Sequence, residues 1–369
     1  MTEKDWWDKL TQRPLIEWIP FKGVAALVAI FTVMFVVGVL KWPLESTIFQ
    51  WGYRGTGMAQ IYEQKAWDQA LATVDAIPPS YEPYEALEGD LLAGEVYENV
   101  QVLGHVTEDN FLRLMTAITE WVAPEQGCAY CHNEENYAED SVYTKVVSRR
   151  MIQMNQTINA EWTDHVGYAG VNCYTCHRGN NVPEYIWFEE EPQQAGIIGW
   201  RNNQNMPNPR VASSSLPSNV FERFLVEDNE IRVTWPESRG GPTADGVKGA
   251  EWTYGLMMHM STALNVNCAY CHNTRAFNEW SQSPPQRTTA WYGIRMVRDL
   301  NNYYLDPLQP VYPDYRLGAM GDAPKANCAT CHQGVYKPLF GQPMIDDWPE
   351  LVGGPASGNE AVLEQVSAD

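Results

Sequence analysis

Hydrophobic residues recur at helical spacing in several parts of the chain, and polar, Gly-rich or Pro-rich stretches separate them. One predicted helix follows Thr107, a good N-cap residue, and has a single apolar face formed by Phe111, Met115, Ile118 and Val122. Similar stripes predict three more helices, through Val147, Met151, Met154 and Ile158, through Met257, Met260 and Leu264, and over about residues 288–303. The pattern predicts a mainly α-helical protein with extensive loops.

Residues 23–40 form an apolar run without charges. As a helix, its 18 residues would extend about 27 Å, close to the thickness of a bilayer's hydrocarbon core. Tryptophans lie on both sides of it, and Lys and Arg are more frequent before it than after it, which predicts one transmembrane helix with a cytoplasmic N-terminus. A cleaved signal peptide is the alternative, but the run is longer than usual for one and no small-x-small site directly follows it.

The pattern Cys-x-x-Cys-His occurs four times and uses all eight cysteines. It is the attachment signature of c-type haem, in which two thiols bond to the vinyl groups and the adjacent His becomes an axial iron ligand. We therefore predict four covalently bound haem c groups. In chain order the sites are site 1 (Cys128, Cys131, His132), site 2 (Cys173, Cys176, His177), site 3 (Cys268, Cys271, His272) and site 4 (Cys328, Cys331, His332).

Cys-x-x-Cys pairs serve other purposes in some proteins. Paired C-x-x-C motifs hold structural zinc in some proteins, and a single one can be a thioredoxin-like redox pair. Four copies, each followed at once by His and leaving no cysteine over, favour haem. Because haem c is attached on the outer side of the bacterial cytoplasmic membrane, the sites are expected to face the periplasm.

The spacing of the sites predicts two pseudo-repeated dihaem halves. Cys128 and Cys173 are 45 residues apart, Cys268 and Cys328 are 60 apart, and 95 separate Cys173 from Cys268. A Pro-, Gly-, Ser- and Glu-rich stretch fills the middle gap. The predicted segments are a cytoplasmic N-terminal segment (1–22), the transmembrane helix (23–40), a periplasmic lead-in (41–104), the first dihaem half (105–180), an irregular connector (181–244), the second dihaem half (245–340) and a C-terminal tail (341–369).

The chain is strongly acidic. It has 25 Lys and Arg against 46 Asp and Glu, a formal net charge of −21. Nucleic acid is therefore an unsuitable partner. An acidic surface favours encounter with a basic soluble protein, although solubility alone also explains the charge.

The histidine count limits the sixth iron ligands. Of seven histidines, four belong to the motifs, so His105, His165 and His259 cannot make all four haems bis-His. At least one iron must use Met, which raises the reduction potential relative to His, or stay open. The helical Met residues upstream of three motifs are Met115, Met151 and Met257. A Met on an apolar stripe is often only a core residue, so the neighbours Met154, Met258 and Met260 are alternative ligands. For site 4 the candidates are Met296, Met320 and His165, of which His165 is chemically the better ligand.

The order of these residues resembles the tetrahaem cytochrome c subunit of purple-bacterial photosynthetic reaction centres. The resemblance covers about residues 50–340. Four short segments strengthen it: Y-R-G-T-G-M (53–58), N-V-Q-V-L-G (99–104), C-Y-T-C-H-R-G (173–179) and G-I-R-M-V-R-D-L-N (293–301). The chain lacks the lipid-bearing N-terminal cysteine of many members, and the predicted helix at 23–40 would replace that anchor.

The resemblance implies a ligand set and a spatial order. It pairs His132 with Met115, His177 with Met151, His272 with Met257 and His332 with His165. It implies no ligand role for His105 or His259 and places Arg287 near the third haem, where a cation would tune it. It also implies a near-linear row in the order first, second, fourth and third haem, the last facing the membrane complex.

These features predict an electron relay and not an enzyme. It would lie at the bacterial cytoplasmic (photosynthetic) membrane as a single-pass protein with its haems on the periplasmic side. A soluble periplasmic donor, a small cytochrome c or a high-potential iron–sulfur protein, would supply electrons for the photo-oxidised bacteriochlorophyll special pair carried by the reaction-centre membrane subunits. The alternative, a membrane-anchored tetrahaem quinol dehydrogenase, would need mostly His ligation, which the histidine count opposes.

Overall fold

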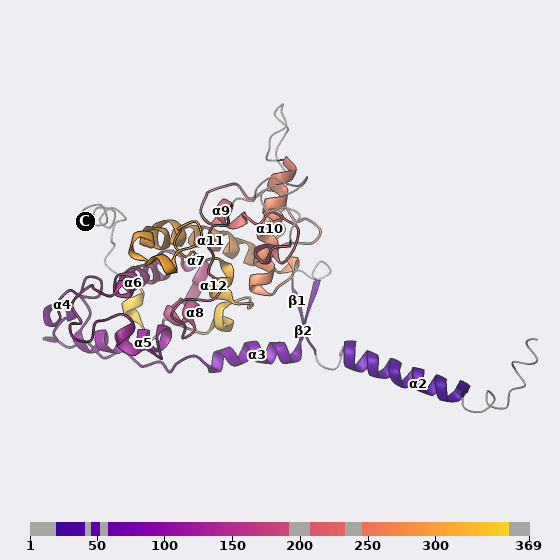
Figure 1. The fold of residues 1–369 in the computed structure, drawn as a ribbon, viewed down its shortest axis with the longest axis horizontal. Helices are drawn as coiled ribbons and strands as arrows, with labels where there is room; N and C mark the ends of the chain where they lie inside the picture. The colour runs from indigo at the N-terminus through magenta and orange to yellow at the C-terminus, as the bar shows by residue number, and fades with distance from the viewer. Residues whose placement is uncertain (1–19, 41–45, 52–57, 192–206, 233–245, 354–369) are drawn as a thin grey trace, which may run out of the picture. The chain divides into compact units, whose positions relative to one another are not determined.

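The computed structural model describes residues 20–40, 46–51, 58–191, 207–232 and 246–353 (Figure 1). The chain divides into two compact units. The first comprises residues 1–50 and 59–70, and the second comprises residues 51–58 and 71–369. All four Cys-x-x-Cys-His motifs belong to the second unit.

The first unit contains an apolar helix and a small sheet. Helix α2 (Pro20–Phe35) continues into a π-helical turn, η1 (Val36–Leu40), so the run predicted to be helical is helical throughout. The described side chains of this run are exposed. No helix in the described ranges combines the length and apolar character needed to cross a membrane. The membrane anchor therefore stays a prediction.

Strands β1 (Ser46–Trp51) and β2 (Met58–Glu63) pair into a two-stranded sheet that leads to helix α3 (Gln64–Asp75). Aromatic packing stabilises the sheet against α3. The ring centroid of Trp67 lies 5.0 Å from that of Phe49 and 4.9 Å from that of Tyr62. The sequence pattern did not predict this hairpin, whose strands are rich in β-favouring aromatic residues. These are the only strands among the residues that the structure describes.

The second unit is helical. The four predicted helices are present as α5 (Glu108–Val122), α6 (Tyr143–Glu161), α10 (Gly246–Leu264) and α11 (Gln286–Asp299), and the last continues as a π-helical turn, η7 (Leu300–Leu305). The shorter helices are α4 (Ala93–Val96), α7 (Thr163–Val166), α8 (Cys173–His177), α9 (Val220–Leu225) and α12 (Cys328–His332). Short 3-10 turns fill much of the rest, namely η2 (Gly127–Tyr130), η3 (Gly167–Ala169), η4 (Pro209–Val211), η5 (Cys268–Tyr270), η6 (Trp280–Gln282), η8 (Asp306–Val311), η9 (Asp314–Arg316), η10 (Pro338–Gly341) and η11 (Pro349–Leu351).

Two hydrophobic cores hold this unit together. The first core joins α5 to the segment after site 4, where Leu339, Met344, Trp348 and Leu351 are buried against Leu114. Part of the predicted C-terminal tail is thus core. The second core joins α9, α10 and α11, and its buried residues include Phe221, Phe224, Leu256, Ile294 and Val297. The predicted connector therefore contributes α9 to a core, in addition to linking the halves.

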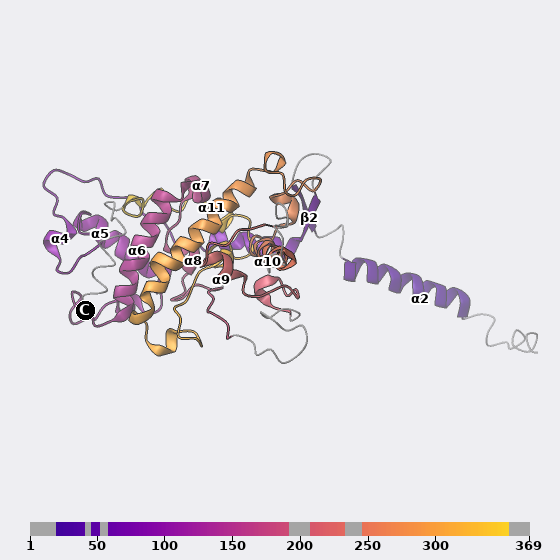
Figure 2. The same cartoon turned by 90° about the horizontal axis from the view of Figure 1, so that it is seen from above.

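The helices that contain or precede the motifs pack against one another in succession. Helix α5 packs against the turn η2 of site 1 and against α8 of site 2, α8 packs against α12 of site 4, and α12 packs against α10, which leads into site 3 (Figure 1). Helix α6 lies along the π-helical continuation of α11, and Figure 2 shows both running through the same part of the unit. These contacts join the elements in the order η2, α5, α8, α12 and α10.

Candidate functional site: four cysteine–histidine motifs

Sites 2 and 4, the inner sites, share one local fold. Each motif forms a one-turn α-helix behind an Asn N-cap and a Thr at its third position, and the two side chains complete a capping box. At site 4 the Thr330 hydroxyl accepts the Asn327 backbone N–H at 2.9 Å. The residue after the His, Arg178 or Gln333, is left-handed and is followed by a glycine that also has positive φ. These residues end each helix directly behind its His.

Sites 1 and 3, the outer sites, have another local fold. The first cysteine of each lies in a 3-10 turn, and a Tyr at the third position takes the place of the capping Thr. An Asn follows each His, and its side chain turns the chain by accepting a backbone N–H two residues on, Asn133 from Glu135 at 3.1 Å and Asn273 from Arg275 at 3.0 Å. Cys128 and Cys268 are exposed, whereas every inner-site cysteine is partly buried.

The imidazoles of the motifs are oriented by the backbone. In each, Nδ1 lies at hydrogen-bond distance from a main-chain carbonyl oxygen, which can only accept, so Nδ1 carries the proton and Nε2 keeps its lone pair. Metal-binding histidines are usually held in this way. The bonds run from His132 to Tyr137 (3.2 Å), from His272 to Phe277 (2.9 Å), from His177 to Asn180 (2.9 Å) and from His332 to Val335 (2.9 Å).

His165 repeats this arrangement outside the motifs. Its Nδ1 donates to the Thr289 carbonyl at 2.9 Å, and its ring faces that of His332 with 6.2 Å between centroids. One metal ion bound by both Nε2 atoms would separate the ring centres by roughly 6 Å, because imidazole nitrogens bind metals at about 2 Å. The ring lies over Gly293, where any Cβ would collide with it. The two imidazoles thus fit a shared iron.

These five histidines are neutral at pH 7. Burial lowers the pKa of His132, His165, His177 and His272, and it lowers that of His332 to about 4. A neutral imidazole is the form that binds a metal. No three His, Cys, Asp or Glu side chains among the described residues are grouped so that they could hold a metal ion by themselves.

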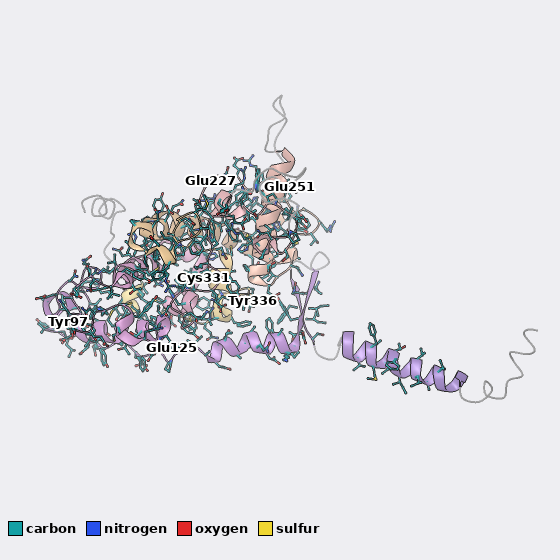
Figure 3. The ribbon with its side chains drawn as sticks, in the orientation of Figure 1. Tyr97, Glu125, Glu227, Glu251, Cys331 and Tyr336 are labelled. Carbon is teal, nitrogen blue, oxygen red and sulfur yellow. The ribbon has the colours of Figure 1, made fainter. Side chains whose placement is uncertain are left out.

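Four of the thiols are poor candidates for a redox pair. Burial raises the pKa of Cys131 and raises those of Cys173, Cys271 and Cys328 to about 12, whereas redox-active C-x-x-C thiols have lowered pKa values. Cys176 and Cys331 come from different motifs, yet their sulfur atoms are 2.6 Å apart. Figure 3 shows Cys331 near the centre of the unit in this view. The inner sites therefore meet at their cysteines.

The candidate methionines lie on the helices where they were predicted. Met115 on α5 is partly buried against the first core, and Met257 on α10 is partly buried against the second. Met154 packs on the second core, whereas Met151 is half-buried and belongs to neither core as the described residues define them. Met260 also packs on the second core, so packing does not separate it from Met257.

The remaining candidates differ in their surroundings. His105 is exposed, and His259 is a core residue, 6% exposed, with its ring 4.5 Å from that of Phe221. Arg287 lies close enough to site 3 for its charge to lower the pKa of His272, which burial lowers more. For site 4, Met296 is buried in the second core and Met320 is 48% exposed.

Sequence reasoning missed the residues that shape the sites. Thr175 and Thr330 complete the capping boxes, and Gly293 makes room for the His165 ring. The signal was present as Asn-Cys-x-Thr-Cys-His-x-Gly, which sites 2 and 4 share and sites 1 and 3 lack.

Known proteins match most of the chain. The family described as "Photosynthetic reaction centre cytochrome C subunit" matches residues 41–352. Proteins named photosynthetic reaction center cytochrome c subunit are 48% identical in Rubrivivax gelatinosus, over 91% of this chain and 91% of the relative, and 46% identical in Roseobacter denitrificans, over 88% and 90%. The protein of that name in Thermochromatium tepidum is 46% identical, over 82% of this chain and 74% of its own length.

Proposed function

This chain belongs to the photosynthetic reaction centre cytochrome c subunits, and we propose how its sites perform that role: each holds one haem c, four in all, in the spatial order 1, 2, 4, 3. The protein is an electron-transfer component that associates with the reaction centre at a bacterial membrane and relays electrons to it; it is not an enzyme. Bound haem supplies a one-electron ferric/ferrous couple. The residues of the chain supply ligands, burial and fixed charge.

The proposed ligands are His132 with Met115, His177 with Met151, His272 with Met257, and His332 with His165. The observation that carries this assignment is that the five proposed histidine ligands all donate Nδ1–H to a main-chain carbonyl and keep Nε2 free for a metal. The 6.2 Å separation of the His165 and His332 rings supports the bis-His pair. Met151 is proposed rather than Met154 because the family resemblance pairs Met151 with His177.

The order 1, 2, 4, 3 rests on packing. Contacts run from η2 through α5, α8 and α12 to α10, and the two inner sites touch through Cys176 and Cys331. Cys176 and Cys331 would each hold one edge of a different haem, so the haems of sites 2 and 4 would be neighbours in the row. Arg287 at site 3 adds a fixed cation that favours the ferrous state of the haem there.

The two halves are proposed to descend from one dihaem unit, residues 105–180 and 245–340. Each half begins with an outer site that forms a 3-10 turn and ends with an inner site that forms a capped α-helix. The spatial order places the two inner sites together, as a two-fold arrangement of duplicated halves would.

The apolar helical run of residues 23–40 is proposed as the single membrane anchor, with residues 1–22 in the cytoplasm and the sites on the periplasmic side. Its support is the uncharged sequence from Gly23 to Leu40 and the exposure of its apolar side chains. Ile30→Lys combined with Val33→Lys should release the protein from membranes in an alkaline wash. If the protein stays bound to reaction-centre-free membranes, another segment anchors it.

The electron donor is proposed to be a soluble periplasmic protein with a basic docking face, a small cytochrome c or a high-potential iron–sulfur protein. The net charge of −21 supports this choice, because opposite charges steer encounter. The second-order rate of re-reduction should fall steeply as ionic strength rises. A rate independent of salt would exclude charge steering.

Flash spectroscopy tests the relay directly. After a single flash, membranes that contain the complex should show haem oxidation that keeps pace with re-reduction of the special pair. If every haem stays reduced while the special pair is oxidised, the relay assignment fails. The quinol dehydrogenase alternative gains no support from the comparisons, since the relatives that align over most of the chain are reaction-centre cytochromes.

A further inference from the structure

Lys145 is a buried cation at site 1. It lies on α6 and is only 6% exposed. Its ammonium group donates to three successive carbonyls of the loop that follows the first motif, those of Tyr137 (2.8 Å), Ala138 (2.7 Å) and Glu139 (2.9 Å). An ammonium has three donors, so the loop satisfies all of them with backbone oxygens.

One of these carbonyls also holds the proximal histidine. The Tyr137 oxygen accepts from His132 Nδ1 and from Lys145 Nζ. At 3.2 Å, the His132 bond is longer than the corresponding bonds of His165, His177, His272 and His332, which are all 2.9 Å. The other donor is charged, and charged donors make the stronger hydrogen bonds. The lysine therefore weakens the hold of this carbonyl on His132.

Site 3 provides a natural comparison within the molecule. The two outer sites have the same motif letters, the same Asn after the His and the same five-residue span from the His to its carbonyl acceptor. At site 3 the Phe277 carbonyl binds His272 at 2.9 Å, and the cation nearby, Arg287, is directed to the Ser283 hydroxyl. The outer sites thus differ in what shares the proximal carbonyl.

Nearby acids only partly neutralise the lysine. Asp140 lies 3.2 Å from Lys145 but makes a bidentate pair with Arg149, at 2.8 and 2.9 Å. The carboxylate of Glu139 is hydrogen-bonded to Asn133 and Ser141. Two cations share Asp140, so positive charge remains beside the carbonyl that holds His132.

We propose that Lys145 is a tuning residue for the first haem, which raises its reduction potential through the shared Tyr137 carbonyl and through its own charge. The inference rests on the proposed function, because it takes His132 as the axial ligand of that haem. Lys145 is a positioning residue, because it acts on His132 through the Tyr137 carbonyl.

Both effects have the same sign. A strong bond from Nδ1–H makes imidazole a more basic ligand and favours ferric iron, so a weakened bond favours ferrous iron. Reduction lowers the charge on the iron by one, and a nearby cation favours the state with less positive charge. Removing the lysine should therefore make the first haem harder to reduce.

Potentiometric titration of the full haem-loaded chain, with each haem followed by its paramagnetic resonance signal, tests this. Lys145→Met should lower the equilibrium constant for reducing the first haem by about tenfold, equal to about 59 mV for one electron. The other three midpoints should stay where they are. Lys145→Arg, which keeps the charge, should restore most of the loss, and Asp140→Asn, which removes the partial neutralisation, should shift the first midpoint upward.

Arg149→Gln is the matched control. It removes one positive charge from the same helix, one turn along, without touching the Tyr137 carbonyl, and its shift should be smaller than that of Lys145→Met. An unchanged first midpoint in a folded, fully loaded Lys145→Met protein overturns the inference. An equal fall of all four midpoints also overturns it, since it would mark a general structural loss.

Failure of the proposed function is recognised separately. The signal of the first haem is assigned with Met115→His, which should convert that haem alone to bis-His spectra. If that variant leaves all haem signals unchanged, the proposed ligands of site 1 are wrong. If it converts the first haem while Lys145→Met has no effect, only the role of Lys145 is wrong.

Discussion

The inner and outer sites show how one short motif adopts two local folds. Sites 2 and 4 form capped α-helices at the centre of the unit, and sites 1 and 3 form 3-10 turns with an exposed first cysteine. The chemistry of attachment is the same in both. The difference comes from residues that take no part in the attachment chemistry. The inner sites have Thr at the third position of the motif and Gly two residues after the His, whereas the outer sites have Tyr at the third position and Asn directly after the His.

This difference has a functional consequence. An inner His is held by a carbonyl three residues on, within a helix end that the neighbouring motif packs against. An outer His is held by a carbonyl five residues on, in a loop that other side chains can reach. The carbonyl that holds an outer His is therefore open to a second donor, as the contact of Lys145 with the Tyr137 carbonyl shows.

The largest effect is expected at the inner pair. His165→Ala should remove the sixth ligand of site 4 and give one haem that turns high-spin and binds carbon monoxide. Absorption and paramagnetic resonance spectra of the reduced and oxidised protein would show it. His105→Ala, which removes an exposed imidazole, is the control and should change nothing. Unaltered spectra in the His165 variant would contradict the assignment of His165 and His332 as a bis-His pair.

The next effect concerns the core that holds the outer site 1. Arg113 on α5 pairs with Glu350 at 2.7 Å, both side chains being at most 5% exposed, and its guanidinium lies 4.3 Å from the Trp348 ring. Arg113→Met would leave a buried unpaired carboxylate and should cost about 3–5 kcal/mol of unfolding free energy. Denaturant titration measures it. Arg113→Met with Glu350→Leu should recover much of the loss; if it does not, the charge is not the cause.

A smaller effect should separate the two local folds. Thr330→Val keeps the shape of the side chain but leaves the Asn327 N–H without its hydroxyl acceptor, which should cost about 1–3 kcal/mol. Thr116→Val, at an exposed position of α5, is the matched control and should cost much less. If both substitutions have equal effects, the capping box does not distinguish the inner sites.

The smallest effect depends on pH. Hydrogen bonds from Arg149 hold the pKa of Asp140 at about 2, below its ordinary value of about 3.9. The folded state therefore binds fewer protons, so the stability from this carboxylate is present above about pH 4 and is lost as the pH falls towards 2. Because the group is partly exposed, Asp140→Asn should cost only about 0.5–1 kcal/mol at pH 7 and nothing near pH 2. A difference that persists at pH 2 would contradict this.

The sequence predicted the helices because their apolar stripes are local patterns, and the four Cys-x-x-Cys-His motifs are local patterns too. The stripe through Phe111 and Met115 is α5, and that through Met151 and Ile158 is α6. Local patterns did not reveal the β1–β2 hairpin, nor the burial of Trp348 in the first core. Arg113 and Glu350 are 237 positions apart, and no periodicity links such a pair.

For the candidate site, the sequence indicated which types of residue could bind the irons but not always which residue. Counting histidines showed that at least one iron must use Met or stay open, but helical spacing could not choose between Met151 and Met154, which lie less than one turn apart. In the fold, Met154 packs on the second core and Met151 belongs to neither core, but the candidate Met257 also packs on the second core. The carbonyl partners of the five histidines lie three to 124 residues away, so which imidazoles keep Nε2 free could not be read from the motif alone.

The most direct test of the account is the coordination of the four irons. Paramagnetic resonance of the oxidised full-length protein, combined with carbon monoxide titration of the reduced protein, reports every sixth ligand. We predict three low-spin His/Met haems, one low-spin bis-His haem and no carbon monoxide binding. A high-spin signal, or a haem that takes up carbon monoxide, would mean that an iron is open to substrate and would contradict a pure electron relay.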